Sequence, residues 1–234
     1  MKALLSMSTE AIFPHVVELR ANHEECAARN GYTYRHQTEL HWPDIAASFS
    51  KLHEINVSLN AGFDTVIWSD IDVGFTDMTV DIGNLVDDQH WLAGYKQRNL
   101  TRDFICCGLM VIRNCDQSRR FFAEIFRQVD DHFADRKKKV LDMYAGRDYT
   151  DEEYRYDLWM RHPWEQDYVD TMLTNSGYAG VRQCNERQIG CFSRELWHDG
   201  VPWYPGCPTV HITGTPDWAK RSEVWRNYIP LVKR

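Results

Sequence analysis

TVIWSDIDV, at residues 65–73, is the most informative stretch of this sequence. A mainly apolar run of strand length leads directly to two carboxylates, Asp70 and Asp72, at a predicted turn. Side chains at positions i and i+2 of a strand share a face, so both carboxylates can converge on one hard divalent cation. Such a cation would neutralise a diphosphate. The same pattern is also typical of an ordinary strand end and turn, so its meaning depends on the rest of the chain.

Composition excludes several classes of protein. With 234 residues, the chain can bury a full core and suits one large domain. Its net charge of −7 offers no attraction for a phosphate backbone, so we expect no nucleic acid partner. The basic run at residues 136–139 is interpreted as a solvated loop. No window of about 18 apolar residues occurs, so we expect no transmembrane segment.

The cysteines indicate the compartment. There are seven, including the adjacent Cys106 and Cys107, and none shows the paired CxxC spacing of a zinc site. An odd number without a compact disulfide framework favours a reducing cytoplasm, with most thiols buried as small apolar residues. Residues 1–6 are too short for the apolar core of a signal peptide. We therefore expect a cytoplasmic protein.

Strands and helices alternate in the first third of the chain. The expected elements are a strand at residues 2–6, a helix at 14–30 ended by Gly31, a strand at 32–36, and a helix capped by Asp44 and ended by Gly62. The last of these helices leads into the Asp70 strand. Such alternation is typical of a mainly parallel sheet, in which ligands bind at the carboxyl ends of strands.

The second half is less regular. The expected elements are strands at 91–95 and 109–112, a helix from there to about Phe133, and a helix at 164–176. Residues 136–163 are charged and aromatic without a clean apolar period, and we interpret them as a long excursion, with a partly helical excursion as the alternative. No internal repeat or linker divides the chain.

Five short segments follow one another in a distinctive order. They are FSKLH at 49–53, WSDID at 68–72, CGLMVIRN at 107–114, WEQD at 164–167 and HITG at 211–214. Together they resemble the motifs of retaining GT-A glycosyltransferases. The first segment is similar to a Ser/Thr-Lys-Leu-His motif that glycogenin-like enzymes carry on the helix before their Asp-x-Asp strand. The later segments resemble motifs of the galactosyl-, mannosyl- and xylosyltransferase family, which includes fungal Golgi and plant xyloglucan enzymes. Each piece is weak alone, but their common order is specific.

This resemblance implies a fold and an activity. The fold would be α/β, a single Rossmann-like GT-A domain over residues 1–234 with a mainly parallel central sheet flanked by helices. Residues 1–95 would form a nucleotide-binding half and residues 96–234 an acceptor-side half. The activity would move a hexose or pentose from a nucleotide diphosphate sugar, with a UDP-sugar as the expected donor, to a glycan or other hydroxyl acceptor with retention. The lack of an anchor would make it cytoplasmic or a soluble catalytic domain.

The resemblance also implies a metal site made of Asp70, Asp72 and His211. A Mn²⁺ or Mg²⁺ ion there would act as a Lewis acid on the diphosphate leaving group. A mixed oxygen and imidazole ligand set favours Mn²⁺ over Mg²⁺. The alternative for His211 is an ordinary surface or core histidine.

Donor-binding candidates follow from the same resemblance. They are Ser6, Lys51, Asp70, Gly108, Gly214 and Lys220. A basic side chain near the diphosphate would stabilise charge as the bond breaks, which favours Lys51 and Lys220. Lys220 lies six residues after Gly214, where the family has three, so Arg221 competes with it for this role.

Catalytic candidates lie at the start of the 164–176 helix. The resemblance puts Gln166 beneath the anomeric carbon, where its amide carbonyl could stabilise an oxocarbenium-like charge. Glu165 or Asp167 could instead act as a nucleophile, or both could simply favour a helix N-terminus. Sugar-stacking candidates are Trp197, Trp203 and Tyr204.

Two other functions remain open at this point. A haloacid-dehalogenase-like phosphatase also follows a strand with Asp-x-Asp, but here Gly74 stands where that family usually has Thr or Val. A non-catalytic module that binds sugar nucleotides or glycans could use the same fold.

Overall fold

The computed structural model describes residues 1–42, 47–98, 103–146, 148, 150, 165–175, 178–193, 195–196 and 201–234. In chain order, its main elements are β1 (Lys2–Met7), α1 (Val17–Asn30), β2 (Thr33–Gln37), α2 (Ser50–Asn60), β3 (Thr65–Ser69), β4 (Val73–Phe75), β5 (Leu92–Arg98), β6 (Asp103–Arg113), α3 (Asp116–Tyr144), α5 (Glu165–Asn175), β7 (Val181–Cys184), β8 (Cys191–Phe192), β9 (Thr209–His211) and α6 (Trp218–Tyr228). No helix in these ranges is long and apolar enough to cross a membrane.

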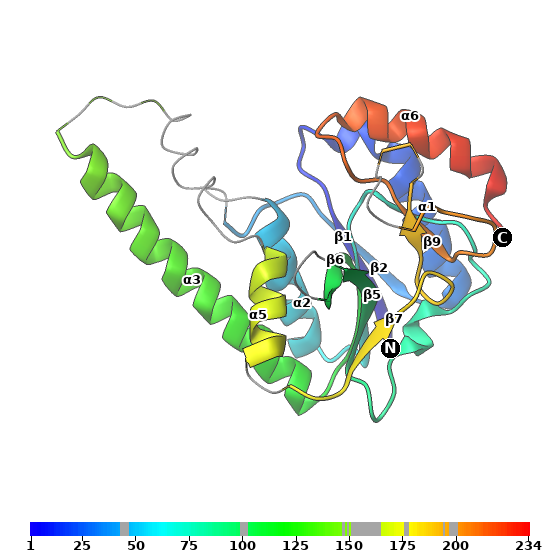
Figure 1. Cartoon of the computed structure of the whole chain (residues 1–234), viewed down its shortest axis with the longest axis horizontal. Coiled ribbons are helices and arrows are strands. Elements are labelled where there is room, and N and C mark those ends of the chain that lie inside the picture. The colour runs from blue at the N-terminus through cyan, green and yellow to red at the C-terminus, as the bar shows by residue number, and fades with distance from the viewer. Residues whose placement is uncertain are drawn as a thin grey trace.

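The strands form two sheets (Figure 1). The larger has six strands in the order β2-β1-β3-β6-β5-β7, and the smaller has the order β4-β9-β8. In the larger sheet β1 runs parallel to β2 and β3, and β5 runs parallel to β7, while β6 is antiparallel to both its neighbours. The sheet is therefore mostly parallel and flanked by helices, which confirms the fold class expected from the sequence.

Helices cover both faces of the larger sheet. α2, α3 and α5 pack on one side, and α1, α6 and the smaller sheet lie on the other (Figure 1). Successive side chains of a strand point to opposite faces. Leu5 therefore belongs to the core beneath α2 and α3, whereas Leu4 belongs to the core that contains Cys26 of α1.

α1 fixes the position of β4. The Asn22 side chain accepts a hydrogen bond from the Phe75 amide at 2.7 Å and donates one to the Phe75 carbonyl at 3.0 Å. The buried His23 donates from Nε2 to the Val73 carbonyl at 2.6 Å. Burial lowers the pKa of His23 to about 4, so its ring is neutral at pH 7. Because β4 begins directly after Asp72, these bonds also position that carboxylate.

α6 reaches β4 through a close contact. A Cβ atom at Gly74 would lie 2.1 Å from the ring of Trp225, so a larger residue at this position would push α6 away. Trp225 itself is buried. The contact holds α6 beside the strand that follows Asp72, and this brings the first turns of the helix close to the sheet edge.

α3 is longer than the sequence predicted. The expected end near Phe133 is wrong, because the helix continues to Tyr144 and carries the basic run of residues 136–139 that was interpreted as a loop. Residues in this extension are good helix formers, ion pairs such as Lys139 with Asp135 support it, and Val140, seven residues after Phe133, is buried.

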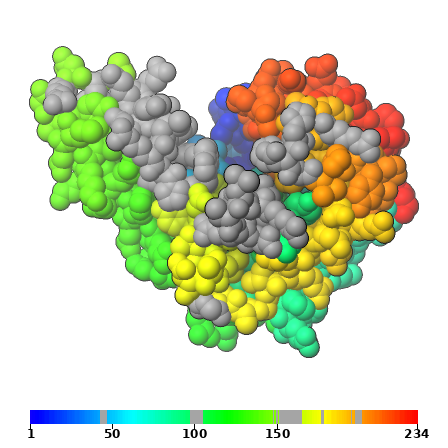
Figure 2. Space-filling view, in the orientation of Figure 1, coloured from blue at the N-terminus to red at the C-terminus, as the bar shows by residue number. Residues whose placement is uncertain are grey.

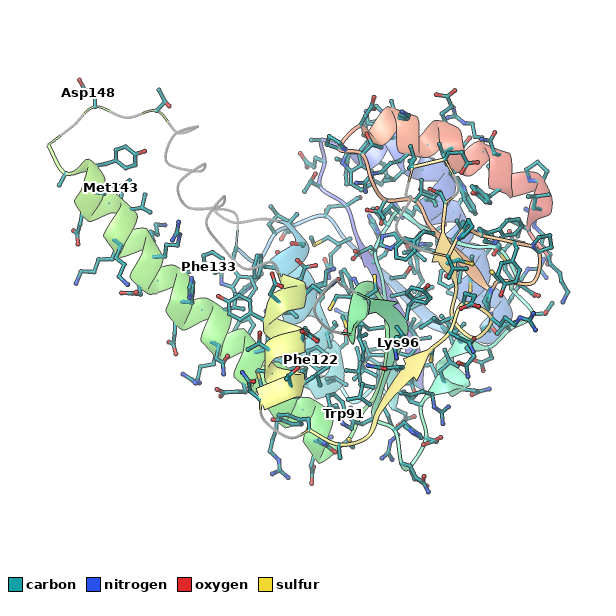
Figure 3. The ribbon with its side chains drawn as sticks, in the orientation of Figure 1. Trp91, Lys96, Phe122, Phe133, Met143 and Asp148 are labelled. Atoms are coloured by element: carbon teal, nitrogen blue, oxygen red, sulfur yellow. The ribbon has the colours of Figure 1, made fainter. Side chains whose placement is uncertain are left out.

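The two halves of α3 differ in their surroundings. Phe122 and Phe133 belong to the core that packs against the larger sheet, whereas Met143 is exposed near the far end of the helix (Figure 3). Figure 2 shows this end standing apart from the main body. The Asp44 cap and most of the 136–163 excursion beyond the helix lie outside the described residues.

Candidate functional site

Asp70 and Asp72 flank a tight turn between β3 and β4. The Val73 amide donates to the Asp70 carbonyl at 2.9 Å, and the Asp70 amide donates to the Gly108 carbonyl at 2.7 Å. The sequence suggested that the two aspartates share one face at the end of a single strand. In the structure Asp70 follows β3 and Asp72 precedes β4, so they do not lie on one continuous strand. The turn, and not the pleat of a strand, brings their carboxylates together.

β9 delivers the third member of the group. It runs antiparallel to β4, with His211 opposite Val73, and the Ile212 amide donates to the Asp72 carbonyl at 2.8 Å. As a result, ligand atoms of Asp70, Asp72 and His211 all lie within 4.8 Å of one another. Two carboxylates and one imidazole at this spacing could hold a divalent cation. The three residues fit the metal that the sequence implied.

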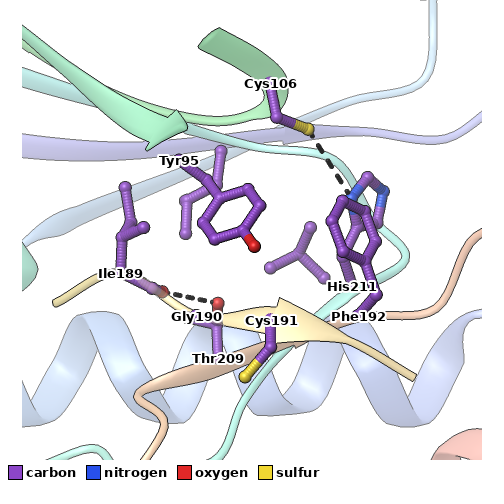
Figure 4. A pocket seen from close by; sticks show the side chains of 10 residues that line it. Tyr95, Cys106, Ile189, Gly190, Cys191, Phe192, Thr209 and His211 are labelled. Atoms are coloured by element: carbon purple, nitrogen blue, oxygen red, sulfur yellow. Dashed lines mark hydrogen bonds between the residues drawn. The ribbon is translucent and has the colours of Figure 1, made fainter. Parts of the chain in front are cut away.

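Gly108 makes room for the His211 ring. A Cβ atom at this position would lie 2.5 Å from Cε1 of His211. On the same edge of the ring, Nδ1 lies 3.9 Å from the Cys106 sulfur (Figure 4). The residues around that edge, which include Tyr95 and Phe192, enclose a mainly apolar cavity of about 20 Å³, enough for one water molecule.

A larger cavity opens on the side of the carboxylates. Its volume is about 170 Å³, and it lies where β1 and β3 end. Its lining combines apolar side chains with the hydroxyl groups of Ser8, Thr9 and Ser48 and with charged side chains. The charged and aromatic lining residues are Lys51, Trp68, Asp70, Asp72, Trp218 and Arg221. Its position at the carboxyl ends of parallel strands is the usual ligand position of this architecture.

The two aspartates have different electrostatic environments. Asp72 is buried, and although burial opposes it, the nearby His211 and Arg221 lower the pKa of Asp72. Asp70 accepts hydrogen bonds from Nε1 of Trp68 at 2.7 Å and pairs with Lys51. Burial nevertheless raises the pKa of Asp70, and the charge on Asp72 adds to that rise. Asp72 is therefore the more strongly ionised of the two.

His211 carries a proton in the absence of metal. Burial alone would lower the pKa of His211, but the Asp72 carboxylate, whose Oδ1 lies 3.3 Å from Nε2, outweighs it and raises that pKa to about 10. An imidazole must lose this proton before it can bind a metal.

Lys51 is buried inside the protein, with 1 % of its surface exposed. Its ammonium group lies 2.9 Å from Asp70 and 2.9 Å from Glu165, and it donates to the Cys107 carbonyl at 3.3 Å. Burial opposes the charge, but the two carboxylates raise the pKa of Lys51 above its usual range. The family resemblance implied that this lysine faces the donor. In the structure Lys51 lines the cavity, but its hydrogen bonds are made to other groups of the protein.

The start of α5 meets β6 beside this lysine. The Cys107 amide donates to Oε1 of Gln166 at 3.3 Å, which places Gln166 next to the Gly108 segment. Glu165 is buried against Lys51, which lowers the pKa of its carboxyl although burial opposes the change. Asp167 is exposed.

The remaining donor-binding candidates, Ser6, Gly214 and Lys220, are not among the residues that line the cavity. Ser6 is buried and bonded to Tyr34 at 2.7 Å and to His36 at 2.8 Å, while Ser8, two residues on, lines the cavity. Gly214 and Lys220 are exposed and are absent from the described cavity lining.

α6 contributes two cavity residues, of which sequence reasoning missed one. Trp218 and Arg221 lie three residues apart on one face of a helix capped by the Asp217 side chain. Arg221 was recognised only as a competitor of Lys220, and Trp218 was not singled out. The Asp217 cap followed by an i, i+3 pair is the signal that could have identified them.

The aromatic side chains predicted to stack on a sugar are not exposed where the structure describes them. Trp203 is buried and donates to Thr76 Oγ1 at 3.1 Å, so it is a core residue and does not offer an exposed ring. Tyr204 is half-buried in the apolar core near α6. Trp197 lies outside the described residues.

Comparison with known proteins identifies the fold. No protein-family model matches the sequence, and no curated protein matches it. Among solved structures, a glycosyltransferase involved in the glycosylation of the major capsid of PBCV-1 has a TM-score of 0.64 and 14 % identity, covering 97 % of this chain and 98 % of that one. The glycosyltransferase GlyE of Streptococcus pneumoniae TIGR4 has a TM-score of 0.50 and 12 % identity, covering 100 % of this chain and 66 % of that one. At such low identity the likeness concerns the fold, and the fold of this chain is that of the GT-A glycosyltransferases.

Proposed function

We propose that the protein is a metal-dependent glycosyltransferase. It would move a hexose or pentose from a nucleotide diphosphate sugar, with UDP as the nucleotide, to a hydroxyl group of a glycan or smaller acceptor, and would retain the anomeric configuration. The observation that carries this proposal is the convergence of Asp70, Asp72 and His211, of which the two aspartates line a cavity at the carboxyl ends of the strands. The GT-A fold supports it.

Three residues would hold the metal. Asp70, Asp72 and His211 supply two carboxylates and one imidazole, a set that suits Mn²⁺ and also accepts Mg²⁺. When bound, the ion would supply a Lewis acid that neutralises the diphosphate leaving group. His211 would release its proton to solvent as it becomes a ligand. Arg221, on the same cavity wall, adds a positive charge toward the departing diphosphate.

Gln166 is the proposed neighbour of the anomeric carbon. Its amide is oriented by the Cys107 backbone, and an amide can stabilise developing positive charge without becoming a covalent nucleophile. Glu165 is engaged with Lys51, which makes it less available as a nucleophile. In the proposed step the bond from the anomeric carbon to the phosphate oxygen breaks, a bond to the acceptor oxygen forms on the same face, and the acceptor's proton passes to the leaving phosphate.

Ligand-induced stabilisation tests donor and metal together. UDP, GDP and their sugars are added with and without Mn²⁺, and the unfolding temperature is measured, because a ligand that binds only the native state raises it. UDP-sugars should do so only with Mn²⁺, and Asp72→Asn should abolish the effect. Asp131→Asn, which alters an exposed ion pair on α3, is the control. Unchanged UDP affinity in Asp72→Asn would contradict the proposal.

Two outcomes would point to the other functions. Release of phosphate from simple phosphomonoesters, without sugar nucleotide binding, would indicate a phosphatase. Metal-dependent binding of a UDP-sugar with neither transfer nor slow donor hydrolysis would indicate a binding module.

The stereochemical part has its own test. Gln166→Ala should lower turnover strongly and leave donor binding nearly unchanged, because its interaction grows as positive charge develops. Proton NMR of the product's anomeric signal reports the configuration. A β-linked product from an α-linked donor would show inversion and would require a carboxylate general base such as Asp167.

A further inference from the structure

Arg221 is held in the cavity wall by three groups at once. Its Nε donates to the Thr215 carbonyl at 2.7 Å, its Nη1 donates to Oδ2 of Asp72, and its guanidinium carbon lies 4.4 Å from the centre of the Trp218 ring. Only 14 % of the side chain is exposed. Among the described residues, no hydrogen bond engages Nη2. The guanidinium is therefore oriented beside the cavity and retains donor capacity for a ligand.

The contact with Asp72 occupies a carboxylate that a metal would need. Oδ2 of Asp72 binds Arg221, and Oδ1 lies 3.3 Å from Nε2 of His211. On the other side of the turn, Asp70 pairs with Lys51 at 2.9 Å. Both carboxylates of the pair thus already have positive partners within the protein. A cation that enters this site has to compete with at least one of them.

We propose that Arg221 is an internal counter-cation that a divalent ion displaces from Asp72, and that the displaced guanidinium then binds the diphosphate of the donor. This inference rests on the proposed function. Of the two cations, Arg221 is the one that can move, because Lys51 is buried and tied to Glu165 as well. The bond to Thr215 and the stacking on Trp218 do not involve Asp72. These two contacts can keep the guanidinium beside the cavity after it leaves Asp72.

Charge balance links the two events. Asp70, Asp72 and Glu165 contribute −3, and Lys51 and Arg221 contribute +2, so the cluster is neutral while His211 is protonated and carries −1 once His211 has released its proton to become a ligand. A divalent ion alone would change this to +1 and leave a guanidinium facing a metal at short range, which is unfavourable in a partly buried site. A diphosphate removes that repulsion, and the planar guanidinium suits bidentate contacts with phosphate oxygens. Metal and nucleotide should therefore strengthen each other's binding.

Mn²⁺ titrations test this directly, with the paramagnetic resonance signal of the free ion as the readout. Without nucleotide, Arg221→Gln should bind Mn²⁺ about tenfold more tightly than the unmodified protein, because a charge-assisted competitor is gone. Saturating UDP should increase Mn²⁺ affinity strongly in the unmodified protein and much less in Arg221→Gln. Arg226→Gln is the matched control, since Arg226 also lies on α6 and pairs with a carboxylate, that of the exposed Glu18. It should behave like the unmodified protein.

The outcomes separate this inference from the proposed function. Equal Mn²⁺ affinities of Arg221→Gln and the unmodified protein without UDP would overturn the inference even if UDP binds as proposed. An unmodified protein that binds Mn²⁺ but neither UDP nor GDP would overturn the proposed function together with the diphosphate half of the inference. Circular dichroism checks the fold of each variant. Arg221→Lys, which keeps the charge without the planar fork, gives a second test: a UDP effect as large as in the unmodified protein would contradict the role of the guanidinium.

Discussion

The ammonium group of Lys51 lies 2.9 Å from the carboxylate of Glu165, inside the protein, and the same group lies 2.9 Å from Asp70. This one buried cation links α2, which carries Lys51, to α5 and to the turn between β3 and β4 that carries Asp70. Removing one partner of a buried ion pair leaves an uncompensated charge, which is more costly than losing the pair as a whole.

Replacement of Lys51 should therefore destabilise the whole protein. We expect Lys51→Met to lower the free energy of unfolding by about 3–5 kcal/mol, measured by urea denaturation. Lys2→Met, which breaks the half-exposed pair with Asp81, is the control and should cost about 1 kcal/mol or less. Similar losses in the two variants would show that the buried pairs of Lys51 have no special weight.

Gly108→Ala should weaken the metal site through His211. The added Cβ atom would lie 2.5 Å from Cε1 of the ring, so the ring has to leave its present position beside Asp72. Displacing a ligand in this way should reduce Mn²⁺ affinity by about 10–100-fold, as measured by titration. Gly83→Ala is the control, because the nearest atoms to its new Cβ atom belong to the side chains of Lys2 and Asp81 and not to Asp70, Asp72 or His211. An unchanged Mn²⁺ affinity in Gly108→Ala would argue against His211 as a ligand.

Mn²⁺ affinity should rise with pH because His211 must lose a proton. Its pKa is raised to about 10 in the metal-free protein, so below that pH each unit should change the affinity by up to about tenfold. His211→Ala should bind Mn²⁺ more weakly and lose most of this dependence, whereas the exposed His15→Ala should keep it. Titrations at pH 6, 7 and 8 distinguish the two, and parallel curves for both variants would contradict the assignment.

His23 should make the fold sensitive to mild acid. Its pKa falls from 6.5 to about 4 in the folded protein because of burial, so the unfolded chain binds more protons between these values. Stability should therefore be lost as pH falls through this window, by up to about 3 kcal/mol for this residue. The pKa of His36, also lowered to about 4 by burial, acts in the same direction.

The measurement is the free energy of unfolding at pH 7, 6 and 5. His23→Gln should flatten the dependence whatever its effect at pH 7, while His15→Gln should leave the slope unchanged. An unchanged slope in His23→Gln would mean that other groups govern the acid response.

The metal group was accessible from sequence because each of its members carries a local signal. Asp70 and Asp72 follow an apolar strand, and His211 ends a strand just before Gly214, so strand ends could be recognised without the fold. The face of α1 that packs on the sheet follows the helical period, and Gly31 ends the helix in a left-handed conformation with φ of 68°, as expected. These features are decided within a few residues.

The features that the sequence did not reveal are not encoded by a local apolar pattern. The pairing of Arg221 with Asp72 joins residues 149 positions apart, and no local pattern encodes it. Burial of Lys51 between two carboxylates likewise depends on how α2 and α5 meet. The extension of α3 to Tyr144 rests on helix propensity and surface ion pairs, which an apolar period does not reveal.

The pairing of β4 with β9 has a consequence for how the protein matures. Synthesis proceeds from the N-terminus, and early segments can fold before later ones exist. Once β3 and β4 have left the ribosome, the nascent chain carries both aspartates, but β9 and α6, with His211 and Arg221, are synthesised more than 130 residues later. Closing so long a loop is entropically costly, and such distant contacts form slowly. If the protein is the metal-dependent glycosyltransferase proposed above, Mn²⁺ binding should appear after the helical signal has recovered in refolding experiments, and ribosome-bound intermediates that lack β9 should not use a sugar donor.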